Sequence, residues 1–435
     1  MLSSICEGSQ KLFLITTFEF LDFIEFRPTM STVQLVATGV AAASVAIMAS
    51  FFMKKSPVFP SQLVADMVSN RRGKEVPLSK MTIIVTGATN GLGKMICAQL
   101  YSMGVTVIIA SRSPSKCLET IAEIKSKYPD SVGTLKSGII DTSDLDSVKN
   151  FVKQFLAENS ELHALVNNAG IHYVSTAGDP INNLSLEMKS KQGYDLAFAT
   201  NYLGHFLLTE LLLPILSKTS SFGTVVNVAS TYHFLGDGVM LTPPSGKQGL
   251  DAMPPAARSD INHNFIHREF SYGNNKLAQV LHAKELQRRF TAAKSSIRIV
   301  SVCPGWVDTG ILPNNAAGKV VGKLAFSVQE GILSAMCGLF DSSLKGGEFL
   351  GNSVYYLSRQ QYLMDFIYKY NLTRQLSGLM GFWLLLAQKH SYGKCYIEPS
   401  SPYSLDENLA KVLYDWSKEE VAPYVQEVLH LNAKL

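Results

Sequence analysis

The sequence predicts an α/β domain built on a doubly wound parallel sheet, and three observations support that prediction. Short apolar runs rich in β-branched residues alternate with stretches of helical length between about residues 80 and 302. Most of the runs are apolar throughout, as strands buried on both faces of a parallel sheet are. Glycines cluster directly after the first run, at residues 87–93, where a tight turn would open a helix. Strand and helix are therefore expected to alternate through one catalytic domain.

The first strand, at residues 81–86, reads MTIIVT. Its β-branched residues favour extended structure, and the glycines that follow end it. Further strands of this kind are expected at 105–110, 138–140, 164–166, 224–228 and 297–302. Helices are expected at 93–103, through Ile121 and Ile124, and at 144–158, 193–217 and 273–290.

An uncharged segment precedes this domain. Residues 33–53 read VQLVATGVAAASVAIMASFFM, which is long enough to span a bilayer as one helix. Lys54 and Lys55 follow at once, so the positive-inside rule places everything after Met53 in the cytosol. A cleaved signal peptide is the alternative, and the long run far from Met1 speaks against it. Residues 1–32 stay unassigned, 54–79 form a basic linker, 80–345 the oxidoreductase domain and 346–435 a C-terminal extension.

Composition excludes several classes of protein. Hydrophobic residues make up 46% of the 435 residues, too many for a disordered chain. A net charge of +4 is too small for a dedicated nucleic-acid binder. The six cysteines form no CxxC pair and the histidines show no convincing ligand spacing, so no metal site is expected.

The glycine turn predicts a phosphate site. Glycines let the backbone approach a pyrophosphate, and the helix N-terminus that follows favours an anion. Its cofactor-binding candidates are Gly87, Thr89, Asn90, Gly91, Leu92 and Gly93.

The end of the second strand indicates which dinucleotide binds. It carries Ser111 and Arg112 rather than an acid, and a guanidinium can hold the 2′-phosphate of NADP. Lys116 is close enough in sequence to assist. NADP(H) is therefore the expected cofactor, with a plain solvated arginine as the alternative.

A second set of motifs predicts proton transfer. Tyr272 and Lys276 are four residues apart, so they share one face of the expected helix. A phenol has a pKa near 10, and a neighbouring ammonium brings that pKa closer to the working range. Asn201 and Ser230 precede this pair, and the motifs Asn167-Asn168-Ala169-Gly170 and Pro304-Gly305 follow the fourth and last strands.

With these motifs in this order, the chain resembles the short-chain dehydrogenase/reductases. YGNNKLAQVLHAKEL (272–286) and CPGWVDTGI (303–311) resemble their membrane-anchored retinol dehydrogenase-like group. The resemblance covers about residues 80–345 and the tail 393–421, and it implies a Rossmann fold. It implies that Tyr272 is the catalytic acid/base and that Lys276 lowers the pKa of Tyr272 and holds the nicotinamide ribose. It also implies that Ser230 positions the substrate oxygen and that Asn201 supports a relay water. The further cofactor contacts it implies are Asp141, Asn168, Ala169, Gly170, Pro304, Gly305, Val307 and Thr309.

The resemblance implies an NADP(H)-dependent oxidoreductase that interconverts an alcohol and a carbonyl on a lipophilic substrate. Retinal-like or long-chain aldehydes and ketosteroids are the expected substrates, on an endoplasmic reticulum or lipid-droplet membrane. A homo-oligomer is compatible with it. A protochlorophyllide-type reductase is one alternative, and it would require a plastid transit peptide that the acidic N-terminus does not resemble. A non-catalytic NADP-sensing scaffold is the other, and it predicts loss of a catalytic residue, whereas all four are present.

Two segments admit two interpretations each. The stretch 236–268 makes the interval between Ser230 and Tyr272 long, and it forms either a substrate lid or a surface excursion. Residues 376–387 read LSGLMGFWLLLA, too short to span a bilayer. They form either a helix at the membrane surface, which we favour, or a buried helix over the substrate pocket.

Overall fold

The computed structural model describes residues 58–172, 189–219, 222–244, 253–258, 265–309, 325–352, 392–398 and 400–432. For residues 265–270 and 429–432 it describes the backbone alone. The predicted membrane helix 33–53, the N-terminal segment before it and the apolar segment 376–387 lie outside these residues, so all three remain predictions.

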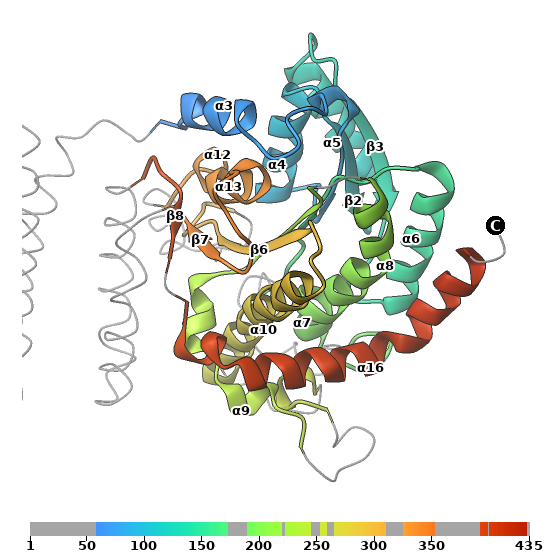
Figure 1. The fold of residues 1–435 in the computed structure, drawn as a ribbon, viewed down its shortest axis with the longest axis vertical. Helices are drawn as coiled ribbons and strands as arrows, with labels where there is room; N and C mark the ends of the chain where they lie inside the picture. The colour runs from blue at the N-terminus through green and yellow to red at the C-terminus, as the bar shows by residue number, and fades with distance from the viewer. Residues whose placement is uncertain are drawn as a thin grey trace, which may run out of the picture. The chain divides into compact units, whose positions relative to one another are not determined.

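A single sheet of eight strands organises the described domain (Figure 1). Its strand order is β3-β2-β1-β4-β5-β6-β7-β8, in which all neighbours pair in parallel except β7 and β8. The strands are β1 Thr82–Thr86, β2 Thr106–Ser111, β3 Thr134–Ile139, β4 Ala164–Asn167, β5 Thr224–Val228, β6 Arg298–Cys303, β7 Phe349–Gly351 and β8 Tyr396–Ile397. The order reverses direction between β1 and β4, which is where open α/β sheets bind ligands. The predicted Rossmann fold is confirmed.

Helices connect the strands on both faces of the sheet. The longer helices are α3 Ser61–Ser69, α4 Gly91–Ser102, α5 Pro114–Lys127, α6 Leu145–Glu158, α8 Gly204–Thr219, α10 Phe265–Ala292, α13 Leu333–Phe340 and α16 Glu407–Asn432. The short ones are η2 Leu78–Lys80, α7 Leu196–Phe198, η3 Ala199–Leu203, η4 Thr231–Leu235, α9 Gly238–Leu241, η6 Pro255–Ala257, α12 Val328–Gly331 and η7 Pro402–Leu405.

Alternate side chains of the strands enter two separate cores, because successive residues of a strand point to opposite faces. Ile84 of β1 and Leu165 of β4 belong to the core that α6, α8, α10 and α16 cover. Ile83 and Val85 of β1 belong to the core on the other face, which α3, α4, α5 and α13 cover. Figure 1 shows α16 running along the outside of α10 and α8.

Three elements differ from the sequence prediction in their limits. The third strand begins at Thr134 rather than residue 138, because β3 is an edge strand in which only Leu135 and Gly138 are buried and no continuous apolar run marks it. Helix α10 begins at Phe265, eight residues before the predicted start. The predicted helix 193–217 is divided into α7, the π-turn η3 and α8.

The sheet also gains strands from the segment predicted as a C-terminal extension. Strands β7 and β8 both follow residue 345, and β8 closes the edge beside β7. Helix α16 lies in the same segment and contributes Leu409, Leu413 and Val421 to the core. The domain limits stay a prediction, and the described part of this segment is integral to the fold.

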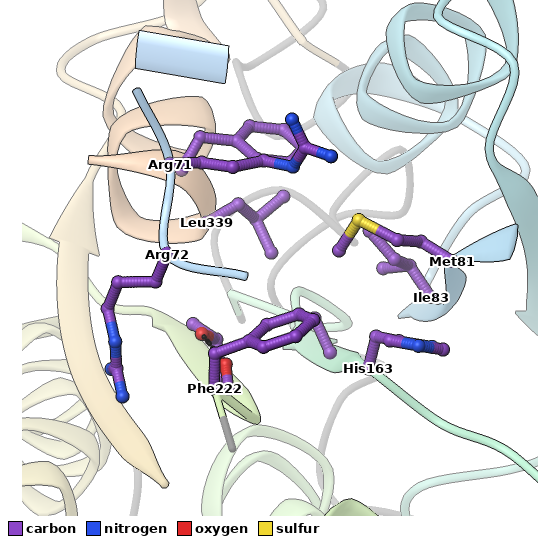
Figure 2. Close-up of a pocket in the computed structure, with 10 residues that line it drawn as sticks. Arg71, Arg72, Met81, Ile83, His163, Phe222 and Leu339 are labelled. Atoms are coloured by element: carbon purple, nitrogen blue, oxygen red, sulfur yellow. Dashed lines mark hydrogen bonds between the residues drawn. The ribbon is translucent and has the colours of Figure 1, made fainter. Parts of the chain in front are cut away.

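A small cavity lies at the amino ends of the strands (Figure 2). Met81, His163 and Phe222 line it together with Arg71 and Arg72 of the basic linker. The guanidinium of Arg71 donates to the carbonyls of Val68 and Val76 at 2.8 and 2.5 Å, and that of Arg72 to Ser296 at 2.6 Å. Backbone carbonyls occupy these donors, so we interpret the arginines as anchors that hold the linker on the sheet.

Among the described residues, one helical stretch is long and apolar enough to cross a membrane. It is Leu196–Thr219, and 89% of its apolar window is buried inside the protein. Its hydrophobicity is explained by packing in the core, since Phe206, Leu207 and Leu211 are all buried there.

Candidate active site

Close backbone contacts define the turn between β1 and α4. Gly87 has φ +62°, and a Cβ on it would lie 2.8 Å from the Cα of Ala169 in the loop after β4. A Cβ on Gly93 would lie 2.4 Å from the carbonyl oxygen of Gly87 and 2.5 Å from Nδ2 of Asn168. Only glycine fits at either position, so the glycines join two loops at the carboxyl edge of the sheet. Asn90 caps α4, its Oδ1 accepting from the amide of Gly91 at 2.8 Å.

Thr86 holds the loop after β4 in place. Its Oγ1 accepts from the amides of Asn168 and Ala169, both at 2.9 Å, and the Asn168 side chain donates back to the Thr86 carbonyl at 2.8 Å. Nδ1 of His205 donates to the carbonyl of Asn201 at 3.1 Å, so its Nε2, 2.9 Å from Thr86 Oγ1, must accept from that hydroxyl. Burial lowers the pKa of His205 to about 4. Sequence reasoning missed both Thr86 and His205, since neither stands in a recognisable spacing.

Asn201 lies in the π-turn η3, between α7 and α8. Such turns occur often at functional sites, because the extra residue re-aims a side chain. The buried Asn201 amide accepts from the amide of Ile171 at 2.8 Å and donates to the carbonyl of Ile171 at 3.0 Å. A Cβ on Gly170 would lie 3.3 Å from Asn201 Oδ1 and 3.8 Å from Lys276 Nζ. The structure therefore brings Asn201 and Lys276 to the same loop.

Lys276 is buried on α10 beside Tyr272. Its Nζ donates to the carbonyl of Val228 and to Oε1 of Gln279, both at 2.9 Å, and lies 5.5 Å from the centre of the Tyr272 ring. Burial lowers the pKa of Lys276 to about 8, while the thiol of Cys303 opposes that shift. The ammonium is thus fixed by two acceptors next to the phenol, as the four-residue spacing predicts.

Two further aromatic rings enclose Tyr272, which is half-buried. The ring of His172 lies 4.3 Å from it and that of Tyr232 lies 5.5 Å from it, both edge-on. His172 comes from the loop that Asn201 holds, and Tyr232 from η4. Sequence reasoning missed both residues, because a lone histidine or tyrosine carries no positional signal.

Ser230 lies two residues after the end of β5 and caps η4, its Oγ accepting from the amide of Tyr232 at 3.2 Å. Helix η4 packs directly on α10. A Cβ on Gly273 would lie 2.9 Å from the carbonyl oxygen of Tyr232, so the glycine after Tyr272 permits this close packing. Ser230 and Tyr272 are therefore carried on two elements in contact.

The remaining cofactor candidates lie around the same edge. Thr89 Oγ1 and Ser111 Oγ are 3.2 Å apart, which links the glycine turn to the end of β2. Arg112 and Lys116 are exposed just beyond it. Asp141 follows β3 and accepts from the amide and hydroxyl of Ser143 at 2.9 and 2.6 Å.

The loop after β6 meets the glycine turn from the other side. A Cβ on Gly91 would lie 3.4 Å from Cγ2 of Thr309, and Leu92 lies close to Val307 across Gly331. The side chain of Asn352 donates to the carbonyl of Pro304 at 2.9 Å, and Gly305 has φ +79°. The segments predicted to hold the two halves of a dinucleotide are thus adjacent.

The described part of the 236–268 stretch packs against the domain. Leu241, Ala256 and Ala257 are buried in the core, and Asp195 donates its amide to the carbonyl of Ala257 at 2.8 Å. His263 and the side chain of His267 lie outside the described residues. Among the residues that are described, no three His, Cys, Asp or Glu side chains gather into a metal-binding group.

Comparison with known proteins identifies the family. The short chain dehydrogenase model matches residues 81–267. Human polyprenol dehydrogenase is 30% identical over 310 residues, which cover 69% of this chain and 84% of that protein. The chain belongs to the short-chain dehydrogenase family. It is an oxidoreductase, as the sequence predicts.

Other short-chain dehydrogenases extend the likeness. Short-chain dehydrogenase/reductase pkfC of Emericella nidulans is 32% identical over 252 residues, covering 58% of this chain and 72% of that one. Human retinol dehydrogenase 14 is 26% identical over 360 residues, covering 80% and 88%, and confirms the resemblance to the retinol dehydrogenase-like group. A crystal structure of an uncharacterised Mycobacterium paratuberculosis protein shares the fold, with a TM-score of 0.52 at 23% identity, covering 80% and 94%.

Proposed function

We propose that this short-chain dehydrogenase interconverts a carbonyl and an alcohol on a lipophilic substrate with NADP(H), using Tyr272 as acid/base. The observation that carries the proposal is the placement of Lys276, whose Nζ is fixed on two acceptors 5.5 Å from the Tyr272 ring centre. A cation held there favours the phenolate form of a neighbouring phenol, which proton transfer requires.

The residues at the carboxyl edge fit a dinucleotide. The N-terminus of α4 offers backbone amides to a pyrophosphate, and Gly87 and Gly91 have positive φ, at +62° and +50°. Because these glycines carry no side chain, a pyrophosphate can approach the turn closely. The exposed Arg112 and Lys116 stand beyond β2, and two cations there favour the 2′-phosphate of NADP(H) over the bare ribose of NAD(H).

Each catalytic candidate has a distinct part. NADPH, when bound, supplies the hydride to the carbonyl carbon. The Tyr272 hydroxyl gives its proton to the substrate oxygen, and the Lys276 ammonium stabilises the charge that remains on the phenol. Ser230 offers a hydroxyl to the same oxygen from η4. Asn201 holds the backbone of Ile171 and places its amide beside Lys276, where a relay water would pass the proton onward.

The names of the relatives and one segment of the sequence support the proposed substrate class. Polyprenol and retinol dehydrogenases are named for isoprenoid alcohols, which partition into membranes. The uncharged segment 33–53 would anchor the enzyme to such a membrane with its domain in the cytosol. Large apolar side chains exposed on the described domain include Val239, Tyr403 and Leu405, and Tyr403 lies against Gly238 beside η4. We therefore propose a membrane-dissolved aldehyde or ketone as substrate.

The test is NADPH oxidation by the detergent-solubilised full chain with retinal, long-chain and isoprenoid aldehydes and ketosteroids. Tyr272→Phe is the blank, since it removes the proton donor and keeps the ring against His172. We expect turnover with one aldehyde class, and a loss of at least about 100-fold in the variant, with NADPH binding unchanged.

The outcomes separate the alternatives. If the protein binds NADPH but turns over none of the tested aldehydes and ketosteroids, this substrate class is removed from the proposal. Turnover that persists in Tyr272→Phe would remove Tyr272 from its role. A chain that binds no NADPH at all would remove the cofactor from the proposal, and with it the NADP-sensing scaffold.

A further inference from the structure

His233 lies in η4, three residues after Ser230, and is fully buried. Its ring packs against Phe234 at 4.4 Å and against Phe349 of β7 at 4.5 Å between ring centres. A polar ring in such an apolar setting is stable only when its nitrogens are hydrogen-bonded.

Both nitrogens of His233 are in use. Nδ1 lies 2.7 Å from the carbonyl oxygen of Ser230, and Nε2 lies 3.0 Å from the amide nitrogen of Ser401. Since an amide only donates and a carbonyl only accepts, Nε2 is unprotonated and Nδ1 carries the hydrogen. Burial lowers the pKa of His233 to about 4, which keeps this single tautomer across the neutral range.

These bonds join the turn of Ser230 to the C-terminal segment. The Ser230 carbonyl accepts from Nδ1 and from the amide of His233 at 3.1 Å. Ser401 is 168 residues away in sequence and is itself held, its carbonyl accepting from the amide and hydroxyl of Ser404 at 2.9 and 2.6 Å. Helix η7, which contains Ser404, packs on α10 and α16.

We propose that His233 is a positioning residue that orients Ser230 toward the substrate oxygen, with Ser401 fixing its tautomer. The proposal rests on the proposed role of Ser230. It makes the segment after residue 400 part of the catalytic architecture. Misplacement of a catalytic hydroxyl by about 1 Å lowers turnover up to about 100-fold without weakening cofactor binding.

Two substitutions separate the two bonds. The side-chain amide of His233→Asn reaches the position of Nδ1, so it can donate to Ser230 and cannot reach Ser401. The longer His233→Gln reaches the position of Nε2, so it can accept from Ser401 and leaves the Ser230 carbonyl without the side-chain donor. We expect His233→Gln to lower kcat at least about 10-fold with an unchanged Kd for NADPH, and His233→Asn to retain most of the wild-type kcat while lowering Tm.

A third substitution tests the distant partner. Ser401 has φ −57° and ψ 153°, which proline adopts. Ser401→Pro deletes the amide donor, and its ring Cδ takes the place of the amide hydrogen, so the His233 ring must move away. Displacement of the imidazole that positions Ser230 should lower kcat at least about 3-fold. Each variant is measured as the full detergent-solubilised chain for kcat, KM, Tm and NADPH binding.

The results distinguish this inference from the proposed function. Wild-type kcat in His233→Gln, or equal loss of kcat in His233→Gln and His233→Asn, would overturn the positioning role alone. A wild-type enzyme without Tyr272-dependent turnover would overturn both. A drop in kcat restricted to His233→Gln and Ser401→Pro, at constant NADPH affinity, is the expected result.

Discussion

At the scale of single residues, the site depends on a few polar groups that burial has fixed in one state. Lys276, His205 and His233 are all buried, each with hydrogen-bond partners that define its orientation. Burial lowers the pKa of all three. Groups of this kind reduce the stability of the fold and gain function from their preorganised positions.

The cofactor preference is tested at Arg112. Arg112→Asp should lower the ratio of NADPH to NADH efficiency at least about 10-fold, because a carboxylate repels the 2′-phosphate and accepts from a ribose 2′-hydroxyl. The cofactor preference is measured as the ratio of kcat/KM with NADPH to kcat/KM with NADH. Lys125→Asp, an equal charge change on the exposed surface of α5, is the control and should leave the ratio unchanged. An unchanged ratio in Arg112→Asp would mean that another group reads the phosphate.

The pH dependence of stability is tested at Lys276. Its pKa is about 8 in the folded protein and 10.5 without burial, so the unfolded chain binds more protons between those values. Stability of the wild type should therefore rise with pH in this window, relative to Lys276→Met, by up to about 3 kcal/mol. Denaturant unfolding of both proteins at pH 7.5 and 10 measures the difference. A constant difference would show that the ammonium is not desolvated.

At the scale of elements, a polar cluster around Glu210 helps to hold α16 on the domain. Glu210 of α8 is 8% exposed, and its carboxylate accepts from the hydroxyl of Tyr414 and from Nζ of Lys418, both at 2.7 Å. The hydroxyls of Tyr202 and Ser417 meet at 2.9 Å nearby. Because these contacts face the core, α16 is bound in one register along α8 and α10.

Removing the cation of this cluster should destabilise the fold. Lys418→Met leaves the Glu210 carboxylate buried without its charge partner, which should lower the free energy of unfolding by about 1–3 kcal/mol, less than for a fully buried pair because Lys418 is 44% exposed. Lys411→Met is the control on the same helix, since its partner Asp415 is 41% exposed. That change should cost below about 1 kcal/mol. Equal effects in urea unfolding would contradict the cluster's role.

At the scale of the whole molecule, neutral histidines are distributed through the interior. Burial lowers the pKa of His205 and His233 to about 4 and that of His282 to about 3. The three histidines lie on different elements, so their protonation at low pH would destabilise several parts of the core together.

Stability should fall as the pH drops from about 6.5 to 4. The unfolded histidines take up protons near pH 6.5 and the folded ones do not, so the unfolded state binds more protons throughout that window. The free energy of unfolding should decrease by several kcal/mol, measured by urea unfolding at pH 7, 6, 5 and 4.5. His282→Gln should reduce the slope, and a flat profile in the wild type would contradict the buried neutral state.

The membrane prediction is also tested on the whole chain. Deletion of residues 1–53 should release part of the protein into the soluble fraction after cell lysis, with the rest retained if residues 376–387 also contact the bilayer. Complete release would assign residues 376–387 to the domain. Retention of all the protein would mean that 33–53 is not the anchor.

The sequence by itself determined the features that depend on local spacing. The glycine turn before α4 and the four-residue step from Tyr272 to Lys276 are encoded within one turn or one helix, and apolar runs mark the buried strands. Edge strand β3 was located only in part, because four of its six residues are exposed and its apolar pattern is weak.

Only the tertiary structure decided the contacts between distant segments. Thr86 meets His205, Asn201 meets Ile171 through a π-turn, and His233 meets Ser401 across 168 residues. No helical or strand period relates such positions. The sequence pattern around a single polar residue among apolar neighbours is the same whether that residue is buried or exposed. Their partners are chosen when the two cores close over the sheet and every buried donor must find an acceptor.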